Sequence, residues 1–220
     1  MKALELITSR QSCRAFKADP IPGPVLKEIL DAAGNSPSYT NTQPWEAAVV
    51  TGAGRDRLSR LLLQLAETRA PVSPDIPIPE NWPPQLQERA QEHGARRLAT
   101  LGVARDDKEG REELRLMNYN FYGAPCAVFL FMDPGLGEWS LYDMGLFTQN
   151  LVLAAHSLGV STCIQASVTH YAKEIKAFLG LAGEKKLLSC IALGYPDGNA
   201  RLNEYRSQKK KPAEFVSQHS

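Results

Sequence analysis

Three polar side chains near the N-terminus stand at alternating positions, as Arg10, Ser12 and Arg14. In an extended or turning stretch, residues at alternating positions face the same way. Two guanidinium groups beside a hydroxyl suit a phosphate, because each guanidinium can donate two parallel hydrogen bonds to phosphate oxygens. The segment therefore predicts either a phosphate clamp or the solvated start of a helix.

A second polar segment, residues 36–45, reads SPSYTNTQPW and precedes a short apolar run. Its prolines should hold the segment rigid at both ends. Asn41 and Gln43 each carry an amide that donates and accepts hydrogen bonds, which suits the carbonyl and N–H edge of a planar heterocycle. The same composition is typical of an ordinary asparagine-rich turn, so both interpretations stay open on the residues alone.

The remaining residues offer less chemistry. Gly52 and Gly54 do not form a dinucleotide-binding fingerprint, because Arg57 occupies the place of the last glycine. The four histidines and four cysteines lack the spacing of metal ligands. A nucleophilic Cys163 would need a base beside it, and the sequence indicates none. We therefore predict no metal ion and assign no residue a catalytic acid–base role.

The pattern of apolar residues predicts the elements that must position these segments. Helical spacing over a long stretch indicates an amphipathic helix, and a short β-branched or apolar run between loops indicates a buried strand. Helices are expected over 24–33, 54–69 and 141–158, and strands over 47–51, 126–132 and 187–193. Strands that alternate with helices indicate an α/β or α+β domain.

Two stretches carry no core signal. Four prolines interrupt residues 70–81, and residues 85–117 are charged and weakly helical. We expect residues 70–117 to form a mobile cap over the surface. The tail, residues 199–220, is expected either to be disordered or to pack on a neighbouring subunit. At 220 residues, the chain fits a single domain spanning 1–220.

Composition argues against several classes of partner. The formal net charge is only +1 and the basic residues are scattered, so nucleic acid and anionic membranes are poor partners. No stretch has the length of uncharged sequence needed to cross a bilayer, and the N-terminus lacks the pattern of a signal peptide. Isolated cysteines suit a reducing compartment, so the expected setting is cytoplasmic.

The two polar segments occur together, in one order, with further matching segments downstream. With these, the sequence resembles the FMN-dependent nitroreductase family. The matching segments span nearly the whole chain: SRQSCRAF, SPSYTNTQPW, YDMGLFTQNLVLAAHSLGVSTC, IALGYPD and KKKPAEFV.

The resemblance implies an α+β fold in which a mixed β-sheet flanked by helices forms an intertwined homodimer. One FMN would lie in each subunit interface, and the helix over 141–158 would form the dimer core. NADH or NADPH would donate electrons, and the enzyme would reduce nitroaromatics, quinones or similar small electrophiles by ping-pong hydride transfer. Reductive dehalogenation, enone reduction, flavin binding without turnover and a flavin-consuming lyase remain alternatives.

The resemblance also implies which residues bind the cofactor. Arg10 and Ser12 would hold the FMN phosphate, with Gln11 in the same segment, and Arg14 would lie toward the pyrimidine edge or the ribityl chain. The partner subunit would contribute Pro37, Ser38 and Tyr39.

Further positions follow from the same resemblance. Asn41 and Gln43 match the family's NxQPW signature, and Asn118 resembles an asparagine that contacts the flavin. Ile164 and Gln165 fall in a loop over the flavin, where the better-known branch of the family has a Glu-Gly pair. At the C-terminal phosphate site the family typically has an arginine; here the matching residue is Lys210, with Lys209 beside it.

Overall fold

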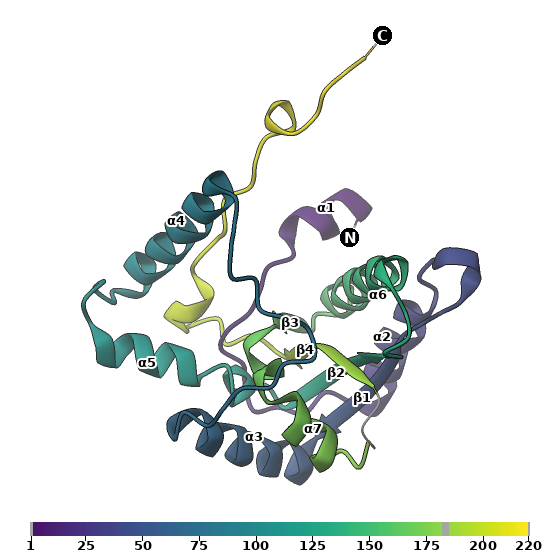
Figure 1. Cartoon of the computed structure of the whole chain (residues 1–220), viewed down its shortest axis with the longest axis horizontal. Coiled ribbons are helices and arrows are strands. Elements are labelled where there is room, and N and C mark those ends of the chain that lie inside the picture. The colour runs from purple at the N-terminus through teal and green to yellow at the C-terminus, as the bar shows by residue number, and fades with distance from the viewer. Residues whose placement is uncertain (1, 182–184, 220) are drawn as a thin grey trace.

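A four-stranded β-sheet forms the centre of the molecule (Figure 1). The computed structural model describes residues 2–181 and 185–219. The strand order is β1-β2-β4-β3, and all neighbouring strands pair antiparallel. An isolated parallel bridge between Ser12 and Thr162 adds the parallel component at the β3 edge. The strands are β1 Glu46–Thr51, β2 Cys126–Met132, β3 Ser161–Gln165 and β4 Lys186–Gly194.

Strand β2 is buried along its whole length. It lies inside the sheet between β1 and β4, and helices cover both of its faces, so an uninterrupted apolar run (CAVFLFM) is what this position requires. The strand predicted over 126–132 is thereby confirmed at both ends. Strand β4 extends one residue beyond the predicted 187–193 at each end.

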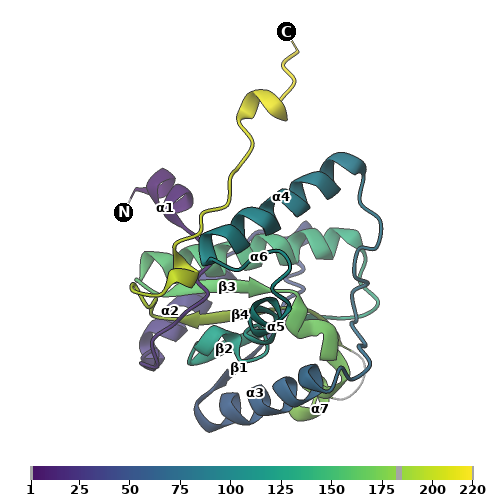
Figure 2. The same ribbon diagram turned by 90° about the vertical axis from the view of Figure 1, so that its left-hand side faces the viewer.

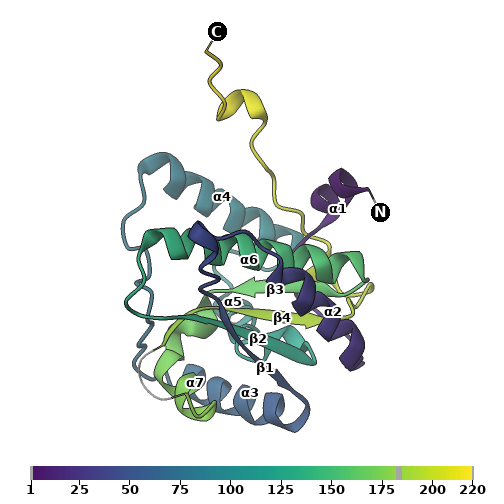
Figure 3. The same cartoon turned by 90° about the vertical axis from the view of Figure 1, so that its right-hand side faces the viewer.

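Helices pack against both faces of the sheet, as Figures 1 and 3 show. On one face, Ile29 of α2 and Leu151 of α6 belong to one apolar cluster with β2 and β4. On the other face, Leu58 of α3 and Ile175 of α7 belong to a second cluster. The helices are α1 Ala3–Ser9, α2 Gly23–Gly34, α3 Gly52–Glu67, α4 Pro84–Leu101, α5 Lys108–Leu116, α6 Glu138–Ser157 and α7 Ala172–Phe178.

The sequence-based predictions for the three apolar helices are confirmed with small shifts of their ends, and the observed layers give the predicted α+β fold. Two predictions about strands were wrong. The strand near 47–51 is not buried: β1 is an edge strand, and Val49 is 40% exposed although its neighbour Val50 is only 6% exposed. Ile164 and Gln165, which the resemblance put in a loop, lie in β3, whose short and partly polar sequence gave little apolar signal.

The predicted cap contains more regular structure than expected. Residues 70–83 are irregular, as predicted, but α4 and α5 are complete helices. Gly102 ends α4 with a left-handed φ of 72°, and the Asp107 carboxylate caps α5 by accepting a hydrogen bond from the Gly110 amide. Figure 2 shows α4 lying above the sheet, with the C-terminal tail rising beside it.

Both chain ends project from the body of the molecule, and the tail rises away from it in all three views (Figures 1 to 3). Residues 206–219 are exposed throughout. Several apolar side chains on these projecting segments are at least half exposed: Leu4 and Ile7 on α1, and Phe215 and Val216 in the tail. Neither apolar cluster of the described residues includes a residue of 199–219.

Candidate functional site

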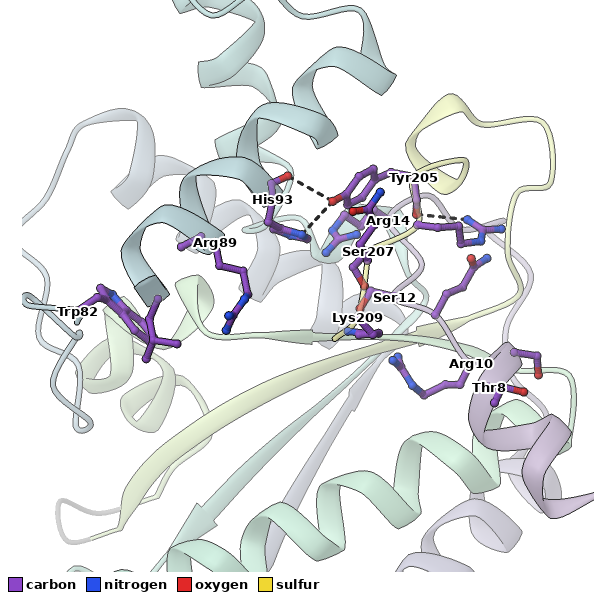
Figure 4. Close-up of a pocket in the computed structure, with 16 residues that line it drawn as sticks. Thr8, Arg10, Ser12, Arg14, Trp82, Arg89, His93, Tyr205, Ser207 and Lys209 are labelled. Atoms are coloured by element: carbon purple, nitrogen blue, oxygen red, sulfur yellow. Dashed lines mark hydrogen bonds between the residues drawn. The ribbon is translucent and has the colours of Figure 1, made fainter. Parts of the chain in front are cut away.

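Three segments enclose a cavity of about 750 Å³ beside the β3 edge of the sheet (Figure 4). Residues 8–14 form one wall, α4 and the residues just before it form the opposite wall, and residues 205–209 close one side. A cavity of this volume is typical of sites for cofactors and small molecules. Five of the residues predicted to bind a cofactor line this cavity: Arg10, Gln11, Ser12, Arg14 and Lys209.

The first polar segment is held by strand-like pairing with β3. The Cys13 amide donates a hydrogen bond to the Thr162 carbonyl at 2.8 Å, next to the Ser12–Thr162 bridge. Cys13 points into the core and is 1% exposed, whereas Ser12 and Arg14 face the cavity. The predicted alternation is therefore confirmed, and it follows from the extended backbone of this segment.

The cavity is cationic. Its lining includes Arg10, Arg14, Arg89, Arg206 and Lys209, and none of the described residues that line it is an aspartate or a glutamate. A concave site lined by charge of one sign raises the local concentration of ligands of the opposite sign. The cavity is thus built for an anion.

The five cations differ in what they already bind. Arg206 donates hydrogen bonds to three backbone carbonyls of its own segment. Arg14 lies beside the hydroxyl of Tyr122, whose pKa is raised by burial and lowered by this arginine. The side chains of Arg10, Arg89 and Lys209 make no hydrogen bond or ion pair with any residue that the structure describes. These three are the cations left for ligands.

His93 and Tyr205 join the wall of α4 to the tail segment. The Tyr205 hydroxyl lies 3.0 Å from Nδ1 of His93. Burial lowers the pKa of His93 below its usual value of 6.5, and the charges of Arg14, Arg97 and Lys209 lower it further. Both influences favour the neutral form of the imidazole.

Burial raises the pKa of the Cys163 thiol, although Arg14, Arg97 and Arg10 pull it in the opposite direction. A protonated thiol that is 2% exposed is a poor nucleophile. The arrangement agrees with the view that Cys163 packs in the core.

Two buried glutamine side-chain oxygens have no hydrogen-bond partner among the residues that the structure describes. They are Oε1 of Gln11, which lines the cavity, and Oε1 of Gln165 at the end of β3. A buried acceptor without a donor costs about 1–3 kcal/mol, so such atoms need an explanation. The Gln165 amide nitrogen is satisfied, because it donates to the Asn118 carbonyl at 2.9 Å.

The second polar segment lies outside this cavity. The carboxylate of Asp143, which is 2% exposed on α6, accepts a hydrogen bond from the backbone amide of Tyr39. Asn150, also on α6, donates from Nδ2 to the Ser36 hydroxyl at 2.8 Å. Hydrogen bonds to α6 therefore hold this loop in place. Within a single chain, the loop does not lie beside Arg10.

The same loop presents its side chains outward. Thr40, Asn41 and Gln43 have left-handed φ angles of 53°, 58° and 49°. Ser38 accepts a hydrogen bond from the Gln43 amide, and the exposed Tyr39 ring stacks on Trp139 at 5.7 Å between centroids. Pro37, like most of the loop, is exposed.

The other predicted residues are dispersed. The side chain of Asn118 is engaged inside the protein, where its Oδ1 accepts a hydrogen bond from the Tyr122 hydroxyl at 2.8 Å. Ile164 is 46% exposed on β3. Lys210 lines a smaller neighbouring cavity of about 250 Å³, while Lys209 lines both cavities. The structure thus places Lys209, rather than Lys210, on the main cavity.

Sequence reasoning missed the wall formed by α4. Leu86, Arg89, Ala90 and His93 of α4 line the cavity at helical spacing, and Trp82 joins them from the irregular segment just before the helix. This spacing was visible in the sequence, but residues 85–117 were interpreted only as a charged cap. Tyr205 and Ser207 of the tail also line the cavity and gave no signal of their own.

Other kinds of site find no support in the described part of the chain. No cluster of three or more potential metal ligands occurs among residues 2–181 and 185–219. Within the same residues, no helix combines the length and apolar character needed to cross a bilayer.

Comparison with known proteins agrees with this geometry. A model of the Nitroreductase family matches residues 7–195. The chain is 38% identical over 205 residues to nitroreductase NfnB of Mycolicibacterium smegmatis, covering 93% of this chain and 87% of that protein. It is 34% identical over 211 residues to a 4-nitrobenzoate reductase of Pseudomonas putida, covering 96% and 92% of the two chains.

Among solved structures, the FMN-dependent nitroreductase NfnB from Mycobacterium smegmatis in complex with NADPH matches with a TM-score of 0.94. The identity in that superposition is 36%, and it covers 99% of this chain and 98% of the other. The family model covers residues 8–14 and α4 but ends before residues 205–209, whereas the superposition on NfnB covers nearly the whole chain. This chain therefore belongs to the nitroreductase family.

Proposed function

We propose that this chain is an FMN-dependent NAD(P)H oxidoreductase that reduces nitroaromatics, quinones or similar small electrophiles. The observation that carries the proposal is the cationic cavity in which Arg10, Ser12 and Lys209 meet without an acidic residue among the lining residues described. The names of its relatives point the same way, because one is described as FMN-dependent and bound to NADPH, and another as a reductase of 4-nitrobenzoate.

The residues present fit FMN. Arg10 and Lys209 have no partner among the described residues, and together with the Ser12 hydroxyl they would hold the phosphate by charge-assisted hydrogen bonds. The buried Gln11 oxygen lacks a donor and could accept a hydrogen bond from an N–H of the flavin ring. Arg14 lies beside Tyr122, where it would face the pyrimidine edge or the ribityl chain.

Bound FMN would supply two-electron hydride transfer between a reduced nicotinamide and the acceptor. The residues of this chain would bind the FMN and orient it. A guanidinium at the pyrimidine edge, the role proposed for Arg14, would stabilise the negative charge that develops there on reduction. Helix α4 forms a wall that limits access of water, so we propose that residues 70–117 cap the site. Nicotinamide and acceptor would share the one open face, which makes the kinetics ping-pong.

We further propose that the active form is an intertwined homodimer with FMN in each interface. The loop that contains Pro37, Ser38 and Tyr39 is anchored away from the cavity of its own chain, so it is available to a partner. Exposed Leu4 on α1 and Phe215 in the tail supply apolar surface for contact. In this arrangement Asn41, Gln43, Asn118, Ile164, Gln165 and Lys210 would complete the site. A stable dimer of this kind buries more than about 2,000 Å².

The proposed setting is the cytoplasm, without a nucleic-acid or membrane partner. The four cysteines are all free and buried, which is compatible with a reducing compartment.

The experiment that tests the function is anaerobic reduction of the FMN-loaded protein. NADH or NADPH should bleach the flavin absorbance, and a later addition of nitrobenzene or a benzoquinone should restore it. Initial rates should give parallel double-reciprocal lines, because donor and acceptor occupy one face in turn. Protein that binds FMN but is bleached by neither nicotinamide would instead be a flavin-binding protein without turnover. Intersecting lines would rule out the ping-pong order.

A further inference from the structure

We propose that Arg89 and Trp82 form a subsite for the anionic group of a flat aromatic acceptor, so that this enzyme favours nitroaromatic acids over uncharged nitroaromatics. The inference rests on the proposed function and names the substrate class of the same site. It concerns the α4 wall of the cavity, which lies across from Arg10 (Figure 4).

The α4 wall presents an apolar surface with one cation in it. Trp82 and Leu86 line the cavity while 47% and 39% exposed, so little of the chain covers them. Ala90 continues this surface one helical turn beyond Leu86. Figure 4 shows Arg89 extending from α4 into the cavity, on the same wall as Trp82. An indole face and a leucine side chain suit a planar ring.

Arg89 is the cation that the cofactor does not require. Arg10 and Lys209 suffice for the phosphate, Arg206 is bound to backbone carbonyls, and Arg14 lies beside Tyr122. The nearest acid along the same face of α4 is Glu92, and it pairs with Arg96 at 2.8 Å instead. The guanidinium of Arg89 thus makes no ion pair or hydrogen bond with any residue described, although it lines a cavity.

The surroundings of Arg89 favour a carboxylate on a ring over a phosphate. A guanidinium fork matches a carboxylate with two parallel hydrogen bonds. Phosphate sites usually add hydroxyl or backbone donors, as Ser12 does beside Arg10. On the wall formed by α4 and the residues just before it, Arg89 lines the main cavity together with Trp82, Leu86, Ala90 and His93, and it also borders the smaller cavity. A ring that packs on this apolar surface would bring its carboxylate to the guanidinium.

The test compares an acid with its uncharged isostere on the FMN-loaded enzyme. Wild type, Arg89→Gln and the control Arg57→Gln are assayed with 4-nitrobenzoate and with 4-nitrobenzamide. Arg57 is a matched exposed arginine on α3, outside both cavities. Arg89→Gln should lower kcat/KM for the acid by about ten- to a hundred-fold, the usual range for losing a charge-assisted hydrogen bond. The value for the amide should stay within about two-fold, as should both values for the control.

A second measurement needs no turnover. Benzoate has no nitro group to reduce, and its dissociation constant, read from the perturbation of the flavin spectrum, should rise in Arg89→Gln to the same degree. The dissociation constant of benzamide should not change. Arg89→Lys keeps the positive charge but lacks the planar guanidinium, so its dissociation constant for benzoate should lie between those of wild type and Arg89→Gln.

Three results would overturn the subsite. Equal losses for acid and amide would make Arg89 a general structural residue, and loss of FMN would place it in the cofactor site. A raised KM for NADPH with an unchanged KM for NADH would assign it to the phosphate of the donor. If wild type reduces neither nitro compound, the proposed function fails, while the benzoate titration still decides whether Arg89 binds a carboxylate.

Discussion

Residues 10–14 and residues 36–43 are both polar segments outside the α-helices and the strands of the sheet, yet the fold holds them in opposite ways. The first runs along β3 and points Arg10, Ser12 and Arg14 into the cavity of its own chain. The second is fixed to α6 through Asp143 and lies outside that cavity. One chain thus builds an anion pocket by itself and displays a second polar loop outward, so the contributions of the two segments can be separated by experiment.

The two segments also differ in the conformation of their backbones. Strand-like pairing gives residues 10–14 a relaxed extended path, in which side chains alternate by geometry. The second loop has left-handed φ angles at Thr40, Asn41 and Gln43, and such conformations cost about 1–3 kcal/mol each for most residues. They persist because buried hydrogen bonds to α6 determine the loop at its base. Its shape is therefore set before any ligand arrives, which lowers the cost of ordering it on binding.

The largest effect expected from the comparison is on the first segment. Arg10→Ala should raise the dissociation constant of FMN by about ten- to a hundred-fold, because it removes a charge-assisted phosphate contact worth about 1.5–3 kcal/mol. Affinity for riboflavin, which lacks the phosphate, should be nearly unchanged. Fluorescence titration of the unloaded protein measures both. Equal weakening of both ligands would show that Arg10 does not contact the phosphate.

A smaller but sharper effect is expected when damage to the two segments is combined across subunits. Consider a heterodimer of an Arg10→Ala chain and an Asn41→Ala chain. If each site takes residue 10 from one subunit and residue 41 from the other, one of the two sites carries both substitutions and the other site carries neither. Such a heterodimer, purified by two different tags, should therefore recover about half of wild-type activity. The two variant homodimers serve as controls. A heterodimer no better than the homodimers would mean that one chain supplies both segments to each site.

The smallest expected effect concerns His93 on the opposite wall. Burial and then nearby cations keep the pKa of His93 below 6.5, and the phosphate of bound FMN should offset those charges and raise that pKa. Because the folded protein disfavours protonated His93, stability should be lost as the pH falls through 6.5, and less so with FMN bound. An NMR titration with and without FMN, with His93→Gln to assign the resonance, measures the shift. A pKa that falls on loading would contradict the placement of the phosphate.

The sequence predicted those parts of the molecule whose local pattern and environment agree. Strand β2 is buried on both faces and reads as an apolar run, so its ends could be predicted to the residue. The exposure of β1 could not be predicted, because it depends on which strand lies at the edge of the sheet. Strand β3 has only five residues and takes its partners from β4, far along the chain. Tertiary pairing of this kind leaves little local signal.

The candidate site likewise contains some residues that the local sequence could predict and others that only the tertiary structure could identify. Arg10, Ser12 and Arg14 could be proposed from spacing, since alternation in an extended segment is a local property. Lys209 could be proposed only from the resemblance, and the structure was needed to place it, rather than Lys210, on the main cavity. The role of α4 could not be predicted, because a charged helix gives no indication of which element it faces. The place of Arg89 on α4, and of Trp82 just before it, could be interpreted only once the opposite wall of the cavity was known.

The pairing of residues 12 and 13 with Thr162 has a consequence for the solubility of the protein. Strand β3 ends the sheet, and an unpaired edge offers its backbone amides and carbonyls to strands of other molecules. The segment that lines the cavity is therefore also a shield over that edge. A chain that loses this segment to proteolysis would expose a template for aggregation together with its empty pocket, so damaged molecules would leave the soluble pool instead of persisting as inactive enzyme.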